Sequence, residues 1–193
     1  MQLILASASP RRKELLGLFH IPFTIRVADI DETMDPAKPP FDEVARVSRL
    51  KALAVEREKD DVVIAADTIV VCEGRVLGKP RSAAEAVQML SLLSGRDHQV
   101  MTGCTVLRNN RCETFTEVTD LHFRSLRQKE IENYVASGEP MDKAGAYGIQ
   151  GYGCLLVEGI VGDYYNVMGL PVGLLSHMLK QFGVNCLKLA AQR

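Results

Sequence analysis

The sequence predicts an α/β protein of the mixed α+β kind, and three observations predict it. Short apolar runs typical of strands alternate along the chain with longer segments of helical periodicity. The run Val62–Ala66 is continuously apolar, as in a strand buried at the centre of a sheet. Two extended segments, 99–107 and 113–123, flank the polar turn Arg108–Arg111, as in a long β-hairpin.

Length and composition narrow the class of protein. The 193 residues suffice for one domain, or for two lobes that share a core. A hydrophobic content of 47% suits a soluble globular protein, and a formal net charge of −1 does not favour binding to a nucleic-acid polymer. No apolar stretch reaches the roughly 18 residues of a membrane span, and no secretion leader is visible. The five cysteines form no Cys-x-x-Cys pair, which favours free thiols and a cytoplasmic location over a zinc site.

The first elements are a strand and a capped helix. Leu3–Ala6 is apolar and strand-like, and helical periodicity follows residue 10. Ser9 suits the N-cap of that helix, and Pro10 suits its first position. The N–H groups at a helix N-terminus attract anions, and Arg11 and Arg12 lie in the same turn. This segment is therefore either a phosphate-binding site or an ordinary capped helix with solvated arginines.

The remaining elements are assigned from caps, breakers and periodicity. Helices are expected over 41–58, from the capping box Ser82–Glu85 to Leu93, from a cap at Ser125–Gln128 to Gly138, and over 171–182 before Gly183. Strands are expected over 23–27, 154–158 and 162–167. A Gly-rich stretch, 142–151, precedes the last two strands.

Acidic residues occur at two places that could serve chemistry. Asp67 follows the buried strand, and ligands of open α/β sheets gather outside the carboxyl ends of strands. A carboxylate there could hold a divalent cation or accept a proton from water, although an ordinary turn aspartate is the alternative. The second group is the loop that contains Asp29, Asp31 and Glu32. If that loop reaches Asp67, Asp31 or Glu32 would complete an oxygen site for Mg²⁺; otherwise the loop is merely solvated.

Three lysines and the Gly-rich stretch could contact a nucleotide. Lys51 lies on a predicted helix, Lys79 is held in a stiff loop by the proline after it, and Lys143 lies in the Gly-rich stretch. Most lysines are only solvated. The stretch matches neither a P-loop nor a dinucleotide fingerprint, but its glycines allow a flat ligand to approach the backbone. Within it, Tyr147 could stack on a base and Gln150 could hydrogen-bond to one.

With these residues in view, the chain resembles the Maf family of nucleotide pyrophosphatases over nearly its whole length. The resemblance rests on motifs in a fixed order: Ser7–Arg12, Glu32, Lys51-Ala52, Ala66-Asp67-Thr68, Gly78-Lys79-Pro80, Asp142–Gly151 and Gly169-Leu170-Pro171. It implies a metal-dependent enzyme that hydrolyses nucleoside triphosphates to the monophosphate and pyrophosphate. It also implies a single Maf-like domain over 1–193: an elongated mixed β-sheet with flanking helices, in two lobes around a cleft, similar to the inosine triphosphate pyrophosphatases.

The resemblance also implies roles for individual residues. Asp67 is expected to act as the base toward the attacking water and to hold Mg²⁺ or Mn²⁺ together with Glu32. Cationic and hydroxyl side chains are expected to bind the substrate: Ser7, Arg11, Arg12, Lys51, Lys79 and Lys143. Base choice is expected to depend on Arg11, Thr68 and Gln150, a combination that resembles the dTTP/UTP branch of the family.

The leading hypothesis is a cytoplasmic pyrophosphatase for dTTP, UTP and related modified pyrimidine nucleotides, which would remove unwanted nucleotides and be linked to arrest of septum formation. One alternative is a nucleotide-binding regulator of septum formation that needs no turnover. Another is a Maf-type pyrophosphatase with a different base preference. Asp67 and Glu32 favour an enzyme, because a pure binder needs no base. The expected partner is the nucleoside triphosphate, with neither a nucleic-acid polymer nor a membrane, and a homodimer is left open.

Overall fold

The computed structural model describes residues 1–191, and the chain divides into two compact units. Unit 1 comprises Met1–Asp67, Thr102–Glu117 and Gly169–Arg193. Unit 2 comprises Thr68–Met101 and Val118–Met168. The predicted domain over 1–193 includes residues 192 and 193, which lie outside the described residues.

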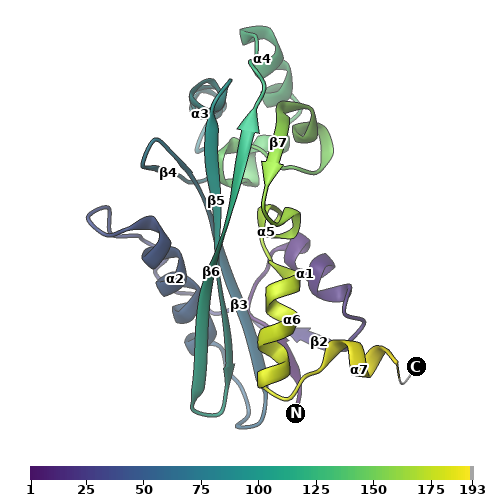
Figure 1. Ribbon diagram of the computed structural model, residues 1–193. Coiled ribbons are helices and arrows are strands. Elements are labelled where there is room, and N and C mark those ends of the chain that lie inside the picture. Colours follow the sequence, from purple (N-terminus) through teal and green to yellow (C-terminus); the bar gives the residue numbers. More distant parts are fainter. Residues whose placement is uncertain (192–193) are drawn as a thin grey trace. The chain divides into compact units, whose positions relative to one another are not determined.

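The hydrogen-bonded strands form a mixed sheet (Figure 1). In residues 1–191 it has seven strands in the order β2-β1-β3-β5-β6-β7, with β4 paired to β3. The strands are β1 (Leu3–Leu5), β2 (Phe23–Ile25), β3 (Val62–Cys72), β4 (Arg75–Leu77), β5 (Asp97–Arg108), β6 (Arg111–Phe123) and β7 (Val157–Val161). β1 runs parallel to β2 and β3, whereas β4 on β3 and β7 on β6 are antiparallel. The predicted mixed α/β class is therefore confirmed.

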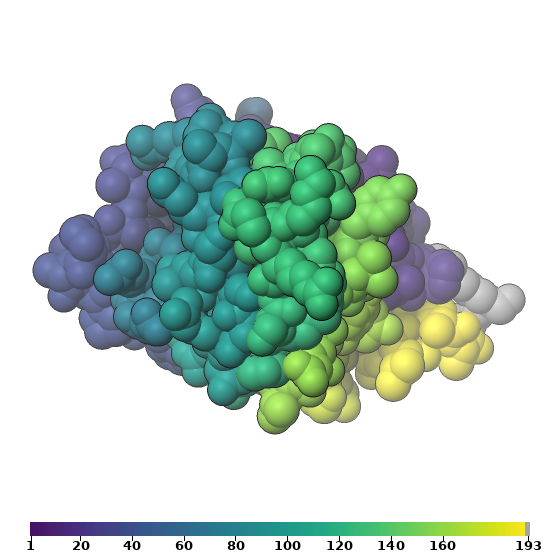
Figure 2. Space-filling model, turned by 90° about the horizontal axis from the view of Figure 1, so that it is seen from above, coloured from purple at the N-terminus to yellow at the C-terminus, as the bar shows by residue number. Residues whose placement is uncertain are grey.

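Unit 1 holds helices on both sides of its strands. The helices are α1 (Pro10–Gly17), α2 (Pro40–Ala54), α6 (Val172–Gln181) and α7 (Cys186–Ala190). Figure 1 shows α2 and α6 on opposite sides of the strands, and the view from above in Figure 2 agrees. On one face, Ile4 and Val63 from the parallel strands form a buried cluster with Ala52 of α2. The core of unit 1 thus joins the parallel strands to α2.

The helix α2 approaches β5 unusually closely, and a glycine makes this approach possible. A Cβ atom at Gly103 would lie 2.3 Å from the carbonyl oxygen of Val44. One turn further along, the Ser48 and Thr105 hydroxyls are 2.8 Å apart, and Thr105 lies 2.9 Å from the Thr114 hydroxyl. This buried chain of hydroxyls satisfies polar groups that would otherwise be unpaired in the core. Together these contacts fix α2, which carries Lys51, against the sheet.

Unit 2 contains the remaining helices and the Gly-rich stretch. They are α3 (Ala83–Leu93), α4 (Gln128–Ala136), α5 (Tyr164–Met168) and the 3₁₀ turns η1 (Glu139–Asp142), η2 (Ala144–Ala146) and η3 (Gly151–Leu156). His98, Phe123 and Tyr147 pack edge-to-face in its core, with ring centroids 4.7 to 5.4 Å apart. His98 Nε2 lies 2.7 Å from the Tyr147 hydroxyl, and burial lowers the pKa of His98 to about 4.

Several sequence-based assignments are confirmed. Ser9 caps α1, where its hydroxyl accepts a hydrogen bond from the backbone N–H of Arg12, and Pro10 begins the helix. Ser82 caps α3 in the same way through the N–H of Glu85. The predicted hairpin is present as β5 and β6. Among the helices of residues 1–191, none combines the length and the apolar character that crossing a membrane requires.

Other assignments are wrong at element ends. The predicted strand 162–167 is largely the helix α5, because Gly162 has φ +128° and ends the extended course of β7, and Asp163 then accepts from the N–H of Tyr165. The helix α4 is capped at Arg127 rather than at Ser125, with the Glu130 carboxylate accepting from the Arg127 N–H. The helix α2 ends at Ala54, since Val55 is already extended. The short helix α7 was not predicted.

The close contact at Gly103 generates a stability prediction. We expect Gly103→Ala to lower the free energy of unfolding by about 1–3 kcal/mol, because an added methyl group forces α2 away from β5. Gly17→Ala is the matched control, since a Cβ there would meet nothing within 4 Å. It should leave stability unchanged or raise it slightly. Denaturant unfolding of both variants measures the difference, and equal midpoints would contradict the packing described for α2.

Candidate active site

The candidate site of unit 1 lies where the parallel pairing of β1 and β3 ends. Leu5 pairs with Ile64, and the N–H of Ala6 donates to the carbonyl of Ile64 at 2.7 Å. Ser7 follows directly, and Asp67 lies three residues beyond Ile64. The prediction that the strand ends at Asp67 is wrong, because β3 continues to Cys72. Asp has a weak preference for strands, but the pairing of β3 with its neighbours in the sheet keeps the chain extended through Asp67. Asp67 nevertheless lies beyond the carboxyl end of β1, the parallel neighbour of β3.

Arg12 is a half-buried cation held by the backbone and by Ser7. Its Nε donates to the carbonyl oxygen of Gly169 at 2.9 Å, and its Nη1 donates to the Ser7 hydroxyl at 3.2 Å. Burial lowers the pKa of the guanidinium, and the nearby Asp67 carboxylate opposes that shift. Arg11 precedes it in α1 and is half-buried. The first turn of α1 thus presents a fixed positive charge, which suits an anion.

Lys51 joins the two predicted acidic groups. Its Nζ donates to Glu32 Oε2 and to Asp67 Oδ1, each at 2.8 Å. The side chains of Lys51 and Asp67 are each 13% exposed, whereas that of Glu32 is 57% exposed. Glu32 therefore lies at the solvent edge of the group. Of the two acidic candidates that the sequence left open, Glu32 approaches Asp67, while Asp31 accepts from the N–H of Thr33.

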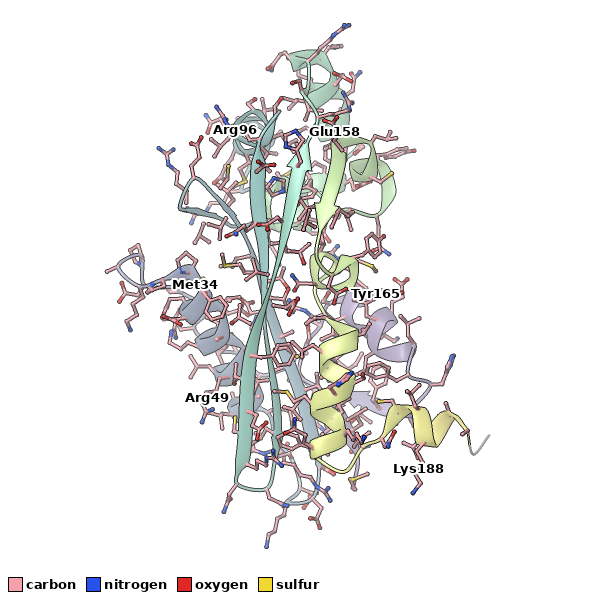
Figure 3. All side chains as sticks on the ribbon, viewed as in Figure 1. Met34, Arg49, Arg96, Glu158, Tyr165 and Lys188 are labelled. Atoms are coloured by element: carbon pink, nitrogen blue, oxygen red, sulfur yellow. The ribbon has the colours of Figure 1, made fainter. Side chains whose placement is uncertain are left out.

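An ion pair on α2, with a buried carboxylate, anchors the loop that carries Glu32, and sequence analysis missed it. Glu43 is 2% exposed and accepts two hydrogen bonds from Arg46, at 2.9 and 2.7 Å. Arg46 also donates to the carbonyl of Thr33, and Glu43 accepts from the N–H of Asp35. These bonds lower the pKa of Glu43 to about 2. Met34 lies on the same loop (Figure 3). An acid and an arginine three residues apart, after a polar loop, were the only signal in the sequence.

Four predicted substrate-binding residues belong to unit 2. Lys79 is exposed on a turn whose neighbour Gly78 accepts from the N–H of Gly145, so this turn contacts the Gly-rich stretch. Lys143 donates to the carbonyl of Glu139 and to the Asp142 carboxylate, both at 2.6 Å. Thr68 and Gln150 are half-buried. The structure thus associates Lys79 and Lys143 with one Gly-rich segment.

Tyr147 does not have the role that the sequence suggested. It is 5% exposed and lies in the core against His98 and Phe123. Desolvation raises the pKa of its hydroxyl, which is hydrogen-bonded to His98. The expectation that Tyr147 stacks on a base is therefore wrong.

A hollow of about 470 Å³ in unit 1 is not the candidate site. It lies at the opposite ends of the parallel strands, where Leu3 pairs with Phe23 and with Val62. Its walls are mainly apolar, which does not suit a highly charged ligand.

Comparisons with known proteins establish the family. A family model described as Maf-like protein matches residues 2–182. Two proteins named dTTP/UTP pyrophosphatase, from Bacillus cereus strain AH820 and from Bacillus anthracis, are each 50% identical over 185 residues, which is 95% of this chain and 97% of theirs. The chain therefore belongs to the Maf family. Among solved structures, the Ham1 protein of Staphylococcus aureus matches with a TM-score of 0.43 and 16% identity, over 64% of this chain and 72% of that one.

Proposed function

We propose that this chain hydrolyses dTTP and UTP to the nucleoside monophosphate and pyrophosphate. The structural observation that carries the proposal is the Asp67 carboxylate, bound by Lys51 and close to Arg12. A carboxylate beside fixed cations can accept a proton from water while the cations stabilise phosphate charge. The relatives that are half identical to this chain are named dTTP/UTP pyrophosphatase, and they supply the choice of nucleotide.

The proposed reaction is attack of water on the α-phosphorus. A water oxygen forms the new bond to phosphorus, and its proton passes to Asp67. The bond between the α-phosphorus and the bridging oxygen breaks, and pyrophosphate leaves with that oxygen. Arg12 and Lys51 would stabilise the charge that develops on the phosphoryl oxygens, with Ser7 and Arg11 orienting the chain of phosphates.

The donor set of unit 1 fits a divalent cation that arrives with the substrate. In residues 1–191, no three His, Cys, Asp or Glu side chains gather into a metal-binding group. Mg²⁺ commonly uses one or two carboxylates and completes its shell with water and substrate phosphates. Glu32 and Asp67 are such a pair, and Lys51 balances only one of their two negative charges. We therefore propose that Glu32 and Asp67 hold Mg²⁺ or Mn²⁺, which would neutralise phosphate charge and polarise a phosphoryl oxygen.

Residues of unit 2 are also proposed to bind the substrate. Lys79 and Lys143 are proposed to contact phosphates, and Thr68 and Gln150, with Arg11 of unit 1, to select the base. Uracil and thymine present an acceptor, a donor and an acceptor along one edge. The amide of Gln150 can both donate to and accept from that edge, whereas a carboxylate could only accept.

Such an enzyme would act on the nucleotide pools of the cytoplasm, and a link to septum formation would follow from that activity. The alternative is a regulator that binds nucleotides without turnover, and such a protein would not need a carboxylate such as Asp67 beside the cations. An assay of pyrophosphate release from each common nucleoside triphosphate, with Mg²⁺ or Mn²⁺, distinguishes the enzyme from the regulator. It also separates a dTTP/UTP enzyme from a relative with another base preference.

Substitution of the proposed base tests the activity. We expect Asp67→Asn to lower the rate of pyrophosphate release from UTP by about 10²-fold or more, because the amide cannot take the proton from water. Asp61→Asn is the matched control: Asp61 is also a buried acid of unit 1, and it caps the backbone N–H groups of Gln2 and Glu58. Asp61→Asn should lower stability while turnover persists. A folded Asp67→Asn protein with the wild-type rate would refute the role of Asp67.

The proposed phosphate contacts are tested by comparing two exposed lysines. We expect Lys79→Ala to lower kcat/KM for UTP by about tenfold or more, as charge-assisted contacts to phosphate are worth about 1.5–3 kcal/mol. Lys180→Ala, at an equally exposed lysine on α6, should leave it unchanged. Steady-state pyrophosphate assays measure both variants. If the two lysines behave alike, Lys79 is solvated surface and contacts no phosphate.

A further inference from the structure

The loop that carries Gln150 is anchored by a carboxylate that no motif identified. Glu139, in η1, accepts three hydrogen bonds. The donors are the hydroxyl of Tyr134 at 2.9 Å, the N–H of Tyr152 at 2.9 Å and the N–H of Gly153 at 3.0 Å. Two of these donors belong to the residues that follow Gln150 closely in the chain. One side chain therefore fixes the backbone on the C-terminal side of Gln150.

The same pair of side chains also fixes the N-terminal side of the loop. The Tyr134 hydroxyl accepts from the N–H of Gly148 at 3.3 Å while it donates to Glu139. Tyr134 is 6% exposed, so this link is shielded from solvent. Gly148 and Gly153, which bracket Gln150, thus share one anchor made of Tyr134 and Glu139.

Two glycines let the loop close around this anchor. A Cβ at Gly153 would lie 2.0 Å from the carbonyl oxygen of Gly148, so the two ends of the loop touch through their backbones. Gly151 has φ +66°, and a Cβ there would lie 2.6 Å from Glu139 Oε2. Residues 148–153 therefore form a tight bend with Gln150 within it, and the Glu139 carboxylate lies against its backbone.

We propose that Glu139 and Tyr134 are positioning residues for base recognition, which act by holding the backbone of Gln150 and do not touch the substrate. The inference rests on the proposed function, in which Gln150 reads uracil or thymine. An amide selects a base edge only where its own backbone is fixed, because a mobile loop must be ordered during binding at the expense of affinity. Fixing the loop beforehand removes that cost for the base that Gln150 recognises.

The test is a double-mutant comparison of substrate choice. Glu139→Gln keeps the shape of the side chain but turns an amide N–H₂ toward groups that are themselves donors. Tyr134→Phe removes one hydroxyl and is the milder variant should Glu139→Gln fold poorly. Glu130→Gln is the matched control, because Glu130 also belongs to unit 2 and accepts from Arg124 and from the N–H of Arg127, neither of which is a residue of the bend 148–153. Each change is made in the wild type and in Gln150→Ala. The value of kcat/KM is measured for UTP and for 7-methyl-GTP, whose cationic purine base lacks the edge that Gln150 is proposed to read.

We expect Glu139→Gln to lower the UTP to 7-methyl-GTP ratio of kcat/KM about tenfold, mainly through a higher KM for UTP, as displacement of a positioning group does. Tyr134→Phe should lower it less, and Glu130→Gln should not change it. In the Gln150→Ala background, Glu139→Gln should lower the ratio no further, since the group that it positions is absent.

Failures of the inference and of the proposed function give different results. If Gln150→Ala lowers the ratio but Glu139→Gln behaves like Glu130→Gln, the positioning role is overturned while base reading by Gln150 stands. Equal losses for Glu139→Gln with and without Gln150 also overturn it, because they would reflect general destabilisation. If Gln150→Ala leaves the ratio unchanged, base reading by Gln150 fails and the positioning role fails with it. If the wild type releases no pyrophosphate from UTP, the proposed function itself fails.

Discussion

The partial burial of two cations, Arg12 and Lys51, at the end of a parallel strand pair is the constraint on which the rest of unit 1 depends. A charge removed from water is costly unless hydrogen bonds and opposite charges replace the solvent. The carbonyl of Gly169, the hydroxyl of Ser7 and the field of Asp67 do this for Arg12, and two carboxylates do it for Lys51. The cations are thereby fixed before a ligand arrives, which is the condition for strong electrostatic stabilisation of a reacting phosphate.

Both units hold the proposed functional side chains through groups that are not themselves proposed to contact the ligand. In unit 1, the Glu43–Arg46 ion pair ties down the loop of Glu32. In unit 2, Glu139 anchors the loop that contains Gln150 by hydrogen bonds to its backbone. In each case a carboxylate accepts hydrogen bonds from the backbone of an irregular segment, from one N–H group for Glu43 and from two for Glu139. These bonds replace those that regular secondary structure would provide. The loops are thus ordered without becoming helix or strand.

The sequence predicts local features of this protein better than tertiary ones. The cap at Ser9 is a local pattern and is confirmed, as is the hairpin. The strand through Asp67 and the burial of Tyr147 depend on neighbours far along the chain, and there the predictions are wrong. The hydrogen bonds of Glu139 could not be predicted from the sequence either, since its partners lie up to 14 residues away across a Gly-rich bend. The residues proposed for chemistry were found through motifs, whereas the residues that hold them required the structure.

The position of bond cleavage tests the central claim most directly. UTP is hydrolysed by the wild-type protein in water enriched in ¹⁸O, and the products are separated and weighed by mass spectrometry. If water is activated at Asp67 and attacks the α-phosphorus, one ¹⁸O atom enters UMP and the pyrophosphate carries none. Label in pyrophosphate, or release of single phosphates in place of pyrophosphate, would contradict the account.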